Sequence, residues 1–205
     1  MSVTSGKRQL LAVTVGFAWL AIVVAGTFML LAYANAPGQP GSPPETWPQS
    51  SQVPHDNERP TLIMFMHPHC PCSRASIGEL AEVMAHCQGR VSAHILFLRP
   101  SEMDPDWVLT DTWREAAKIP GVTVSRDDAG REAKLFGAET SGDTALYDAS
   151  GRLMFHGGIT ISRGHSGDNP GHDTVQALLL GETAQQTNTP AFGCSLFQCK
   201  LKGSR

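Results

Sequence analysis

The sequence predicts an α/β domain with a mixed central sheet flanked by helices, preceded by one transmembrane helix. Strand-like and helix-like runs alternate over residues 59–182, which is typical of a largely parallel sheet. The last two strand-like runs form a hairpin, which makes the sheet mixed. A stretch of 25 residues without a charge, 10–34, comes before all of them.

The N-terminus carries the signals of a single-pass membrane protein. An uncharged helix over residues 10–34 is long enough to cross a hydrocarbon layer of roughly 30 Å. Lys7 and Arg8 precede it and the next positive charge is Arg59. The positive-inside rule therefore predicts cytoplasmic residues 1–9 and a folded domain on the exported side, periplasmic or extracellular.

A cleaved signal peptide is the alternative to an anchor, because residues 32–34 have the small-x-small pattern of a cleavage site. In both cases the domain is exported to a compartment in which disulfides persist. Residues 35–58 are expected to be a linker. Six prolines and two glycines within residues 37–54 favour a semi-rigid spacer or a disordered stretch that does not pack.

The folded part follows the order β-α-β-α-β-α-β-β-α. Its first strand, 61–66, is continuously apolar, as expected for a strand covered on both faces, and apolar residues at helical spacing follow over 72–87. The other expected elements are strands 91–98 and 122–126, helices 111–119 and 128–136, a hairpin of 144–148 and 152–156 around a Gly turn, and a helix over 173–180. Residues 183–205 are expected to be a cysteine-containing tail.

The segment MHPHCPCSRAS, residues 66–76, places two cysteines where the first strand turns into the first helix. The unpaired N–H groups and partial positive charge of a helix N-terminus stabilise a thiolate. Cys70 is therefore the candidate nucleophile, expected to be reachable from solvent in the first helical turn. His69 beside it can lower its pKa further when protonated.

A mixed disulfide on Cys70 must be broken by a second thiol. Cys72 is the nearest candidate, and a strained Cys-x-Cys disulfide would favour an oxidant or isomerase. Cys194 or Cys199 in the tail is the alternative resolving thiol. Cys87, at the end of the first helix, is expected to be a buried apolar residue.

The same segment allows two other interpretations. His67, His69, Cys70 and Cys72 are imidazole and thiolate ligands suited to copper or zinc, so a metal-delivery protein is the alternative function. The spacing of these ligands is unusual for structural zinc sites. A purely structural disulfide is the third interpretation.

The glycine-rich loop, residues 157–172, is the second stretch with candidate site residues. It is either a long polar connection or a loop folded over Cys70. In the second case Arg163 or His165 would bind an anionic substrate group or tune the thiolate. The formal net charge is −3 and the 16 lysines and arginines are scattered, so no nucleic-acid partner is expected.

This element order, with a cysteine motif after the first strand, resembles the thioredoxin fold of exported, membrane-tethered TlpA-like proteins over residues 59–182. The segments HPHCPCSRAS, WREAAKIPGV, TSG-x-x-x-LYD and GGIT-x-x-RGH-x-GDN are most similar to a group labelled RedB. The resemblance implies a membrane-anchored thiol–disulfide oxidoreductase without a cofactor. Its partners would be protein or small-molecule thiols and disulfides.

Two positions depart from the family pattern. When Leu80 is aligned with the equivalent helix leucine, Cys70 matches the attacking cysteine, but Ser73 stands where the resolving cysteine is expected. Cys72 is then a partner shifted by one residue. Gly142 occupies the position expected for the cis-proline that helps to present substrate. A non-catalytic module that only binds a partner is a further alternative.

Overall fold

The computed structural model describes residues 3–184 and 186–197, in two compact units, Met1–Ala36 and Pro37–Arg205. The first unit is helix α1 (Val3–Ala34). Its stretch Arg8–Ala34 has 27 residues and contains an 18-residue window with a mean hydropathy of 2.3, so it is long and apolar enough to cross a membrane. A signal sequence near the N-terminus has the same properties, and both alternatives therefore stand.

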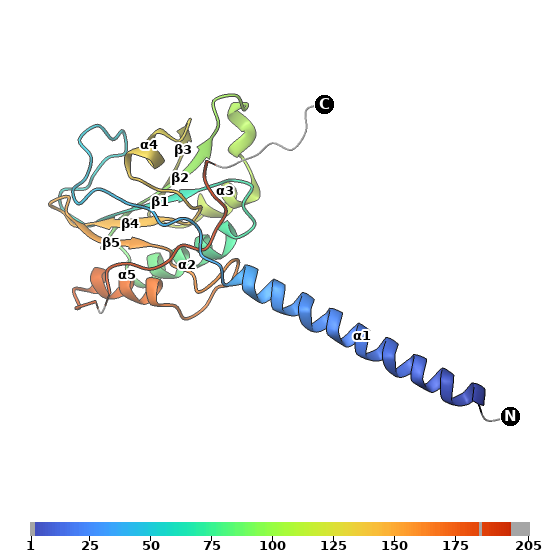
Figure 1. The fold of residues 1–205 in the computed structure, drawn as a ribbon. Coiled ribbons are helices and arrows are strands. Elements are labelled where there is room, and N and C mark those ends of the chain that lie inside the picture. Colours follow the sequence, from blue (N-terminus) through green and yellow to red (C-terminus); the bar gives the residue numbers. More distant parts are fainter. Residues whose placement is uncertain (1–2, 185, 198–205) are drawn as a thin grey trace. The chain divides into compact units, whose positions relative to one another are not determined.

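The second unit contains a five-stranded mixed sheet in the order β3-β2-β1-β4-β5 (Figure 1). Strands β1, β2 and β3 are parallel, whereas β4 is antiparallel to both β1 and β5. The strands are β1 (Thr61–Met66), β2 (Ser92–Arg99), β3 (Val122–Asp128), β4 (Thr144–Tyr147) and β5 (Leu153–Gly157). The predicted α/β class with a mixed sheet is confirmed.

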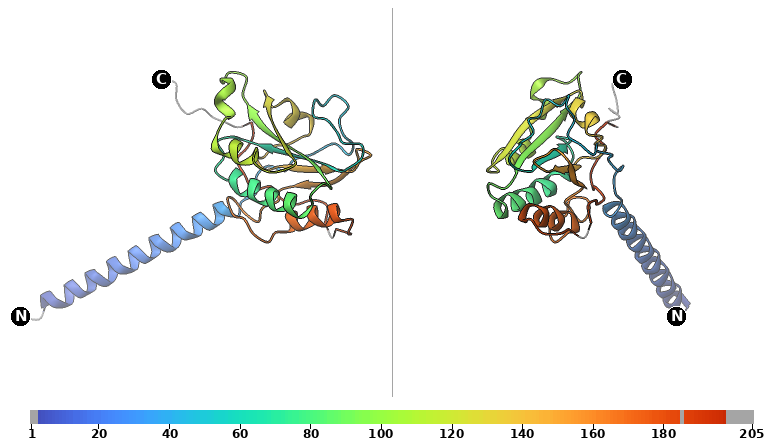
Figure 2. Two further views of the ribbon diagram at one scale, coloured as in Figure 1. Left: turned by 180° about the vertical axis from the view of Figure 1, so that it is seen from behind. Right: turned by 90° about the vertical axis from the view of Figure 1, so that its left-hand side faces the viewer.

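Helices cover the sheet, and α2 and α5 lie side by side on one face (Figure 2). The helical elements are α2 (Ser73–His86), the 3₁₀ turn η1 (Pro105–Val108), α3 (Asp111–Ala116), α4 (Arg131–Leu135) and α5 (Pro170–Leu180). Helix α5 begins three residues before the predicted start because Asn169 caps it, accepting a hydrogen bond from the His172 N–H at 2.8 Å.

Alternation along β1 gives the domain two cores. Leu62 and Met64 face the core shared with α2, α3 and α5, while Ile63 and Phe65 face a second core that includes residues of α4. All six residues of β1 are buried, as predicted for a strand covered on both faces. Helix α4 is short, so other segments must complete the second core.

The proline-rich segment, residues 37–58, helps to cover this second core instead of forming a spacer. Trp47 is 9% exposed, and its ring lies 4.9 Å from the Phe136 ring and 5.2 Å from the Tyr147 ring. Its N–H also donates to the Gly151 carbonyl at 2.7 Å. Composition alone indicated a stretch that does not pack, but a proline-rich segment can pack when one large aromatic side chain anchors it.

The C-terminal segment, residues 186–197, also packs on the domain. Leu196 is 1% exposed within the second core, and its N–H donates to the Glu139 carbonyl at 2.9 Å. The Gly38 N–H donates to the Ala191 carbonyl at 2.8 Å, so the two segments contact each other. Residues 198–205, which include Cys199, lie outside the described residues.

We predict that Trp47→Ala lowers the free energy of unfolding by about 3 to 5 kcal/mol, because it removes a large buried aromatic side chain. Gln49→Ala is the control, since Gln49 is exposed in the same segment. Urea denaturation of the full chain in mild detergent measures both. Equal stability of the two variants would show that the segment does not pack in solution.

Candidate active site

Cys70 lies in the turn that leads from β1 into α2, and the helix begins one residue later than predicted. Helix α2 begins at Ser73 with Cys72 as its N-cap residue. The Cys70 N–H donates to the His67 carbonyl at 3.0 Å, and the Ser73 N–H donates to the Cys70 carbonyl at 3.1 Å. These two hydrogen bonds fix the turn so that free amide groups near the helix start point toward the Cys70 sulfur.

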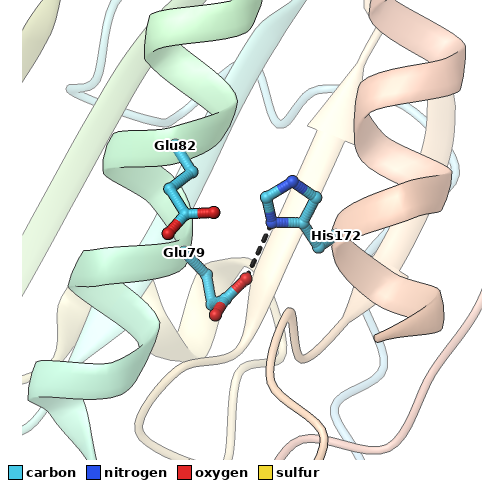
Figure 3. A group of neighbouring side chains, drawn as sticks. All are labelled: Glu79, Glu82 and His172. Carbon is cyan, nitrogen blue, oxygen red and sulfur yellow. Dashed lines mark hydrogen bonds and ion pairs between the residues drawn. The ribbon is translucent and has the colours of Figure 1, made fainter. Parts of the chain in front are cut away.

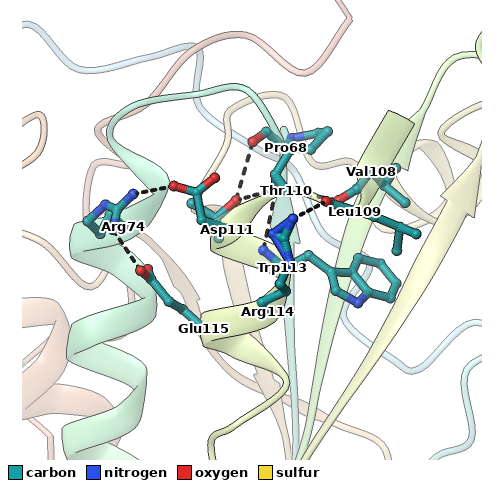
Figure 4. Close-up of polar contacts among 10 residues, drawn as sticks. Pro68, Arg74, Val108, Leu109, Thr110, Asp111, Trp113, Arg114 and Glu115 are labelled. Atoms are coloured by element: carbon teal, nitrogen blue, oxygen red, sulfur yellow. Dashed lines mark hydrogen bonds and ion pairs between the residues drawn. The ribbon is translucent and has the colours of Figure 1, made fainter. Parts of the chain in front are cut away.

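Helix α3 holds this turn from one side. Thr112 donates its hydroxyl to the Pro68 carbonyl at 3.3 Å. Arg74 of α2 forms ion pairs with Asp111 at 3.0 Å and with Glu115 at 2.6 Å (Figure 4). The ion pairs are exposed and contribute little stability, but together with the buried hydroxyl they define the position of the turn.

His69 and His67 differ in their surroundings. The His69 ring packs on Trp107 with 4.5 Å between ring centroids, and its Nε2 lies 3.2 Å from the Trp107 carbonyl. His67 is 7% exposed; burial lowers its pKa, and the charge of Cys70 opposes that effect. His67 is thus in electrostatic contact with Cys70, whereas the ring of His69 contacts Trp107. The assisting role of His69 stays a prediction.

The sulfur of Cys70 is covered, contrary to the prediction that it is reachable from solvent. Cys70 is only 2% exposed. The Cys194 N–H donates to the Cys70 sulfur across 3.3 Å, so part of the cover is the C-terminal segment. The sequence could not predict this, because 124 residues separate the two cysteines.

The pKa of the Cys70 thiol is lowered to about 5. The largest cause is the hydrogen bond from the Cys194 side chain; the backbone N–H groups of Cys194 and Cys72 and the Ser73 hydroxyl act in the same direction. Burial opposes the shift. These hydrogen bonds favour the thiolate form of Cys70, and the main donor is the Cys194 side chain instead of the helix N-terminus that the sequence indicated.

The neighbouring thiols remain protonated. The pKa of Cys72 is raised by burial and then by the Cys70 charge, while Arg163 opposes the shift. The pKa of Cys194 is raised, first by its hydrogen bond to Cys70, then by burial and by the charges of Cys70 and Cys72. Cys87 is fully buried in the core, as expected.

The loop at residues 139–142 faces the cysteine turn. Its Ser141 hydroxyl accepts a hydrogen bond from the His67 N–H at 2.9 Å and lies 3.0 Å from the Ser73 hydroxyl. Gly142 has φ +97°, and a Cβ there would lie 2.9 Å from Ser76 Oγ. The loop thus contacts the motif without a cis-proline. Sequence reasoning missed Ser141, because a lone serine in a loop carries no motif.

The C-terminal segment pairs with this loop through main-chain hydrogen bonds and one isolated bridge. The Ser141 N–H donates to the Cys194 carbonyl at 2.8 Å, and Thr140 forms an antiparallel bridge with Ser195. Gly193 fits closely, since a Cβ at that position would lie 1.9 Å from the Ser141 carbonyl oxygen. Main-chain pairing of this kind is how proteins bind extended peptides, and here it places Cys194 above Cys70.

Of the two candidates in the glycine-rich loop, the structure brings Arg163 to the site. Its guanidinium donates to the Gly193 carbonyl and also hydrogen-bonds the Cys72 thiol. His165 is exposed, and its Nδ1 lies 2.8 Å from the Arg163 carbonyl. The predicted fold of this loop toward the cysteines therefore holds for Arg163 only.

Glu79 of α2 anchors the glycine-rich loop. It is 1% exposed and accepts hydrogen bonds from the Gly167 N–H at 2.7 Å and from Asn169 Nδ2 at 3.3 Å. His172 Nδ1 lies 2.8 Å from Glu79 Oε2, the oxygen that also accepts from Asn169. The dashed line in Figure 3 marks this contact between Glu79 and His172. This buried carboxylate satisfies several donors at once and so fixes the loop that carries Arg163.

Among the described residues, the four side chains proposed as metal ligands are not gathered around one point. Among the residues that the structure describes, Glu79, Glu82 and His172 are the group of three whose ligand atoms lie within 4.8 Å of one another. His67, His69, Cys70 and Cys72 do not converge in this way. Glu79 and His172 already satisfy each other, and Glu82 is exposed.

We predict that the pKa of Cys70, read from the ultraviolet absorbance of its thiolate, is about 5 in the reduced protein. Cys194→Ala should raise it, because the largest hydrogen-bond donor is lost while the amide groups remain. The thiolate would then be lost at a higher pH as the solution is acidified. Cys87→Ala is the control; a titration unchanged in Cys194→Ala would contradict the assignment.

We also predict that Glu79→Ala costs about 1 to 3 kcal/mol of unfolding free energy, because buried donors lose their acceptor. Limited proteolysis should then cut within residues 157–172 more readily than in the wild type. Glu82→Ala is the matched control on the same helix, since Glu82 is exposed. Equal proteolysis of the two variants would exclude an anchoring role for Glu79.

Comparison with known proteins identifies the fold. No family model and no curated protein matches the chain. An uncharacterized conserved protein from Geobacillus kaustophilus matches with TM-score 0.57 and 20% identity over 79% of this chain and 92% of its own. A hypothetical protein from Sinorhizobium meliloti 1021 matches with TM-score 0.58 and 20% identity, over 78% and 93%.

A secreted Mycobacterium tuberculosis disulfide oxidoreductase homologous to E. coli DsbE matches with TM-score 0.44 and 15% identity, over 62% of this chain and 84% of its own. These comparisons give no support to the finer resemblance to proteins labelled RedB, which stays a hypothesis. At such identities the similarity concerns the fold and not the activity. The two matches with TM-scores above 0.5 concern the fold, and with the strand order of the mixed sheet they show that the chain has a thioredoxin-like fold.

Proposed function

We propose that this protein is a membrane-anchored, exported thiol–disulfide oxidoreductase in which Cys70 is the reacting thiol. The observation that carries the proposal is the Cys70 sulfur, which receives hydrogen bonds from the amide groups of Cys72 and Cys194 next to two further thiols. A thiolate is the reactive form in disulfide exchange, and these donors favour it at neutral pH.

The same stabilisation bears on the direction of electron flow. A disulfide whose reduced form is stabilised is a stronger oxidant, because its reduction yields a favourable thiolate. The donors around Cys70 stabilise its thiolate, so a disulfide that includes Cys70 favours oxidation of substrate thiols. The substrates on this proposal are thiols of proteins or small molecules, and no cofactor is required.

The location follows from α1 and from the chemistry. The apolar stretch Arg8–Ala34 is of a length suited to an anchor or a signal, and either would export the domain. Disulfides persist outside the cytoplasm, where a thiol oxidant has substrates. Single-pass anchoring with the domain on the exported side is therefore part of the proposal.

We predict that Cys70→Ser abolishes oxidation of a reduced dithiol peptide by the full-length protein, because a hydroxyl at this position cannot form the disulfide. The rate is measured as loss of free thiol in detergent micelles with oxidised glutathione as the terminal disulfide. Cys87→Ala, a change to a thiol outside the site, should retain the rate. Wild-type rates in Cys70→Ser protein would refute the proposed function.

A further inference from the structure

The C-terminal segment brings to the site a thiol that the Cys-Pro-Cys motif does not contain. We propose that Cys194 is the redox partner of Cys70, and that substrate thiolates open the Cys70–Cys194 disulfide by attacking the Cys194 sulfur. This inference rests on the proposed function and specifies which two sulfurs carry it. It also assigns a different role to each sulfur.

Distance is the first argument. The Cys194 nitrogen lies 3.3 Å from the Cys70 sulfur, and a residue's own Cβ is roughly 2.5 Å from its nitrogen. The Cys194 side chain therefore starts within a few ångströms of Cys70, and it already hydrogen-bonds the Cys70 sulfur. A disulfide requires side chains that start this close and point toward each other.

The second argument is that the backbone around Cys194 is held in place. The Ser141 N–H donates to the Cys194 carbonyl, and the Arg163 guanidinium donates to the Gly193 carbonyl. Leu196 anchors the segment in the second core. Because the segment is hydrogen-bonded and buried on both sides of Cys194, it is an ordered part of the site. It is not a loose tail that happens to pass over the cysteine turn.

Cys72 is less well placed for a disulfide with Cys70. Its backbone is helical, with φ −72° and ψ −21°, and it directly precedes α2. Its thiol also hydrogen-bonds Cys70, but a disulfide between residues only two apart closes a tight, strained ring, so a Cys70–Cys72 bond would require the turn to distort. Cys72 is also only 6% exposed, so a substrate would reach neither sulfur of that pair.

Exposure decides which sulfur of the Cys70–Cys194 pair meets a substrate. Cys70 is buried, whereas Cys194 is partly exposed. A substrate thiolate that attacks Cys194 forms a substrate–Cys194 disulfide and breaks the bond to Cys70, whose sulfur leaves with the electron pair as a thiolate. At this step the Cys194 sulfur is bonded to the substrate and no longer donates, but the backbone N–H groups of Cys194 and Cys72 and the Ser73 hydroxyl still stabilise the Cys70 thiolate, and a stabilised thiolate leaves faster.

The cycle then balances. A second substrate thiolate attacks the substrate sulfur of the mixed disulfide, giving the substrate disulfide and releasing the Cys194 thiolate, which takes up a proton. Two substrate thiols have lost two electrons, and the Cys70–Cys194 pair has gained them. A low-molecular-weight or protein disulfide of the same compartment restores the pair by the reverse exchange.

The test is to map the disulfide in oxidised full-length protein by mass spectrometry of peptides prepared without reductant. The expected result is a cross-link between the peptides containing Cys70 and Cys194, which persists in Cys72→Ser and in Cys87→Ala. Acid quenching soon after a limiting single-cysteine peptide is added should place that peptide on Cys194. These wild-type measurements do not depend on whether a variant folds.

A cross-link between Cys70 and Cys72, or a peptide adduct on Cys70, would overturn the inference while leaving Cys70-dependent exchange intact. Cys194→Ser and Cys194→Ala provide the second arm. Both should lose the cross-link and at least tenfold of the turnover rate, and a wild-type rate in either would also overturn the inference. Failure of the proposed function has a different signature, namely unchanged exchange in Cys70→Ser.

Discussion

The site depends on the main-chain pairing between the C-terminal segment and the loop at residues 139–142. That pairing puts the Cys194 N–H 3.3 Å from the Cys70 sulfur and closes the site to solvent. An ionised sulfur in such a buried position is stable only when hydrogen-bond donors replace the water it has lost. The Cys194 side chain and amide groups from two distant parts of the chain supply those donors.

The architecture makes this pairing possible because the two faces of the sheet are covered differently. Helices α2 and α5 pack on one face, whereas the other face has only the short helix α4. The proline-rich segment and the C-terminal segment complete the second core with Trp47 and Leu196. Segments at both ends of the domain thereby become structural parts of it. The C-terminal segment reaches the end of the central strand β1, after which Cys70 lies.

Support for the site extends to a second layer of contacts. Glu79 holds the glycine-rich loop, which carries Arg163 to the Gly193 carbonyl and to the Cys72 thiol. Ser141 joins the cysteine turn to the opposite loop through His67 and Ser73. A geometry fixed by several buried polar contacts at once is rigid, and rigid donors stabilise a charge without reorganising.

Local apolar periodicity and the chemistry of a helix N-terminus were enough to predict the α/β class, most of the strands, and the position of Cys70 after the first strand. The cover over Cys70, its electrostatic contact with His67, and the approach of Arg163 to the thiols depend on tertiary contacts. The packing of residues 37–58 and 186–197 depends on tertiary contacts as well. These features arise from contacts between residues far apart in the chain, and no local pattern records which distant surface a proline-rich or polar segment will cover.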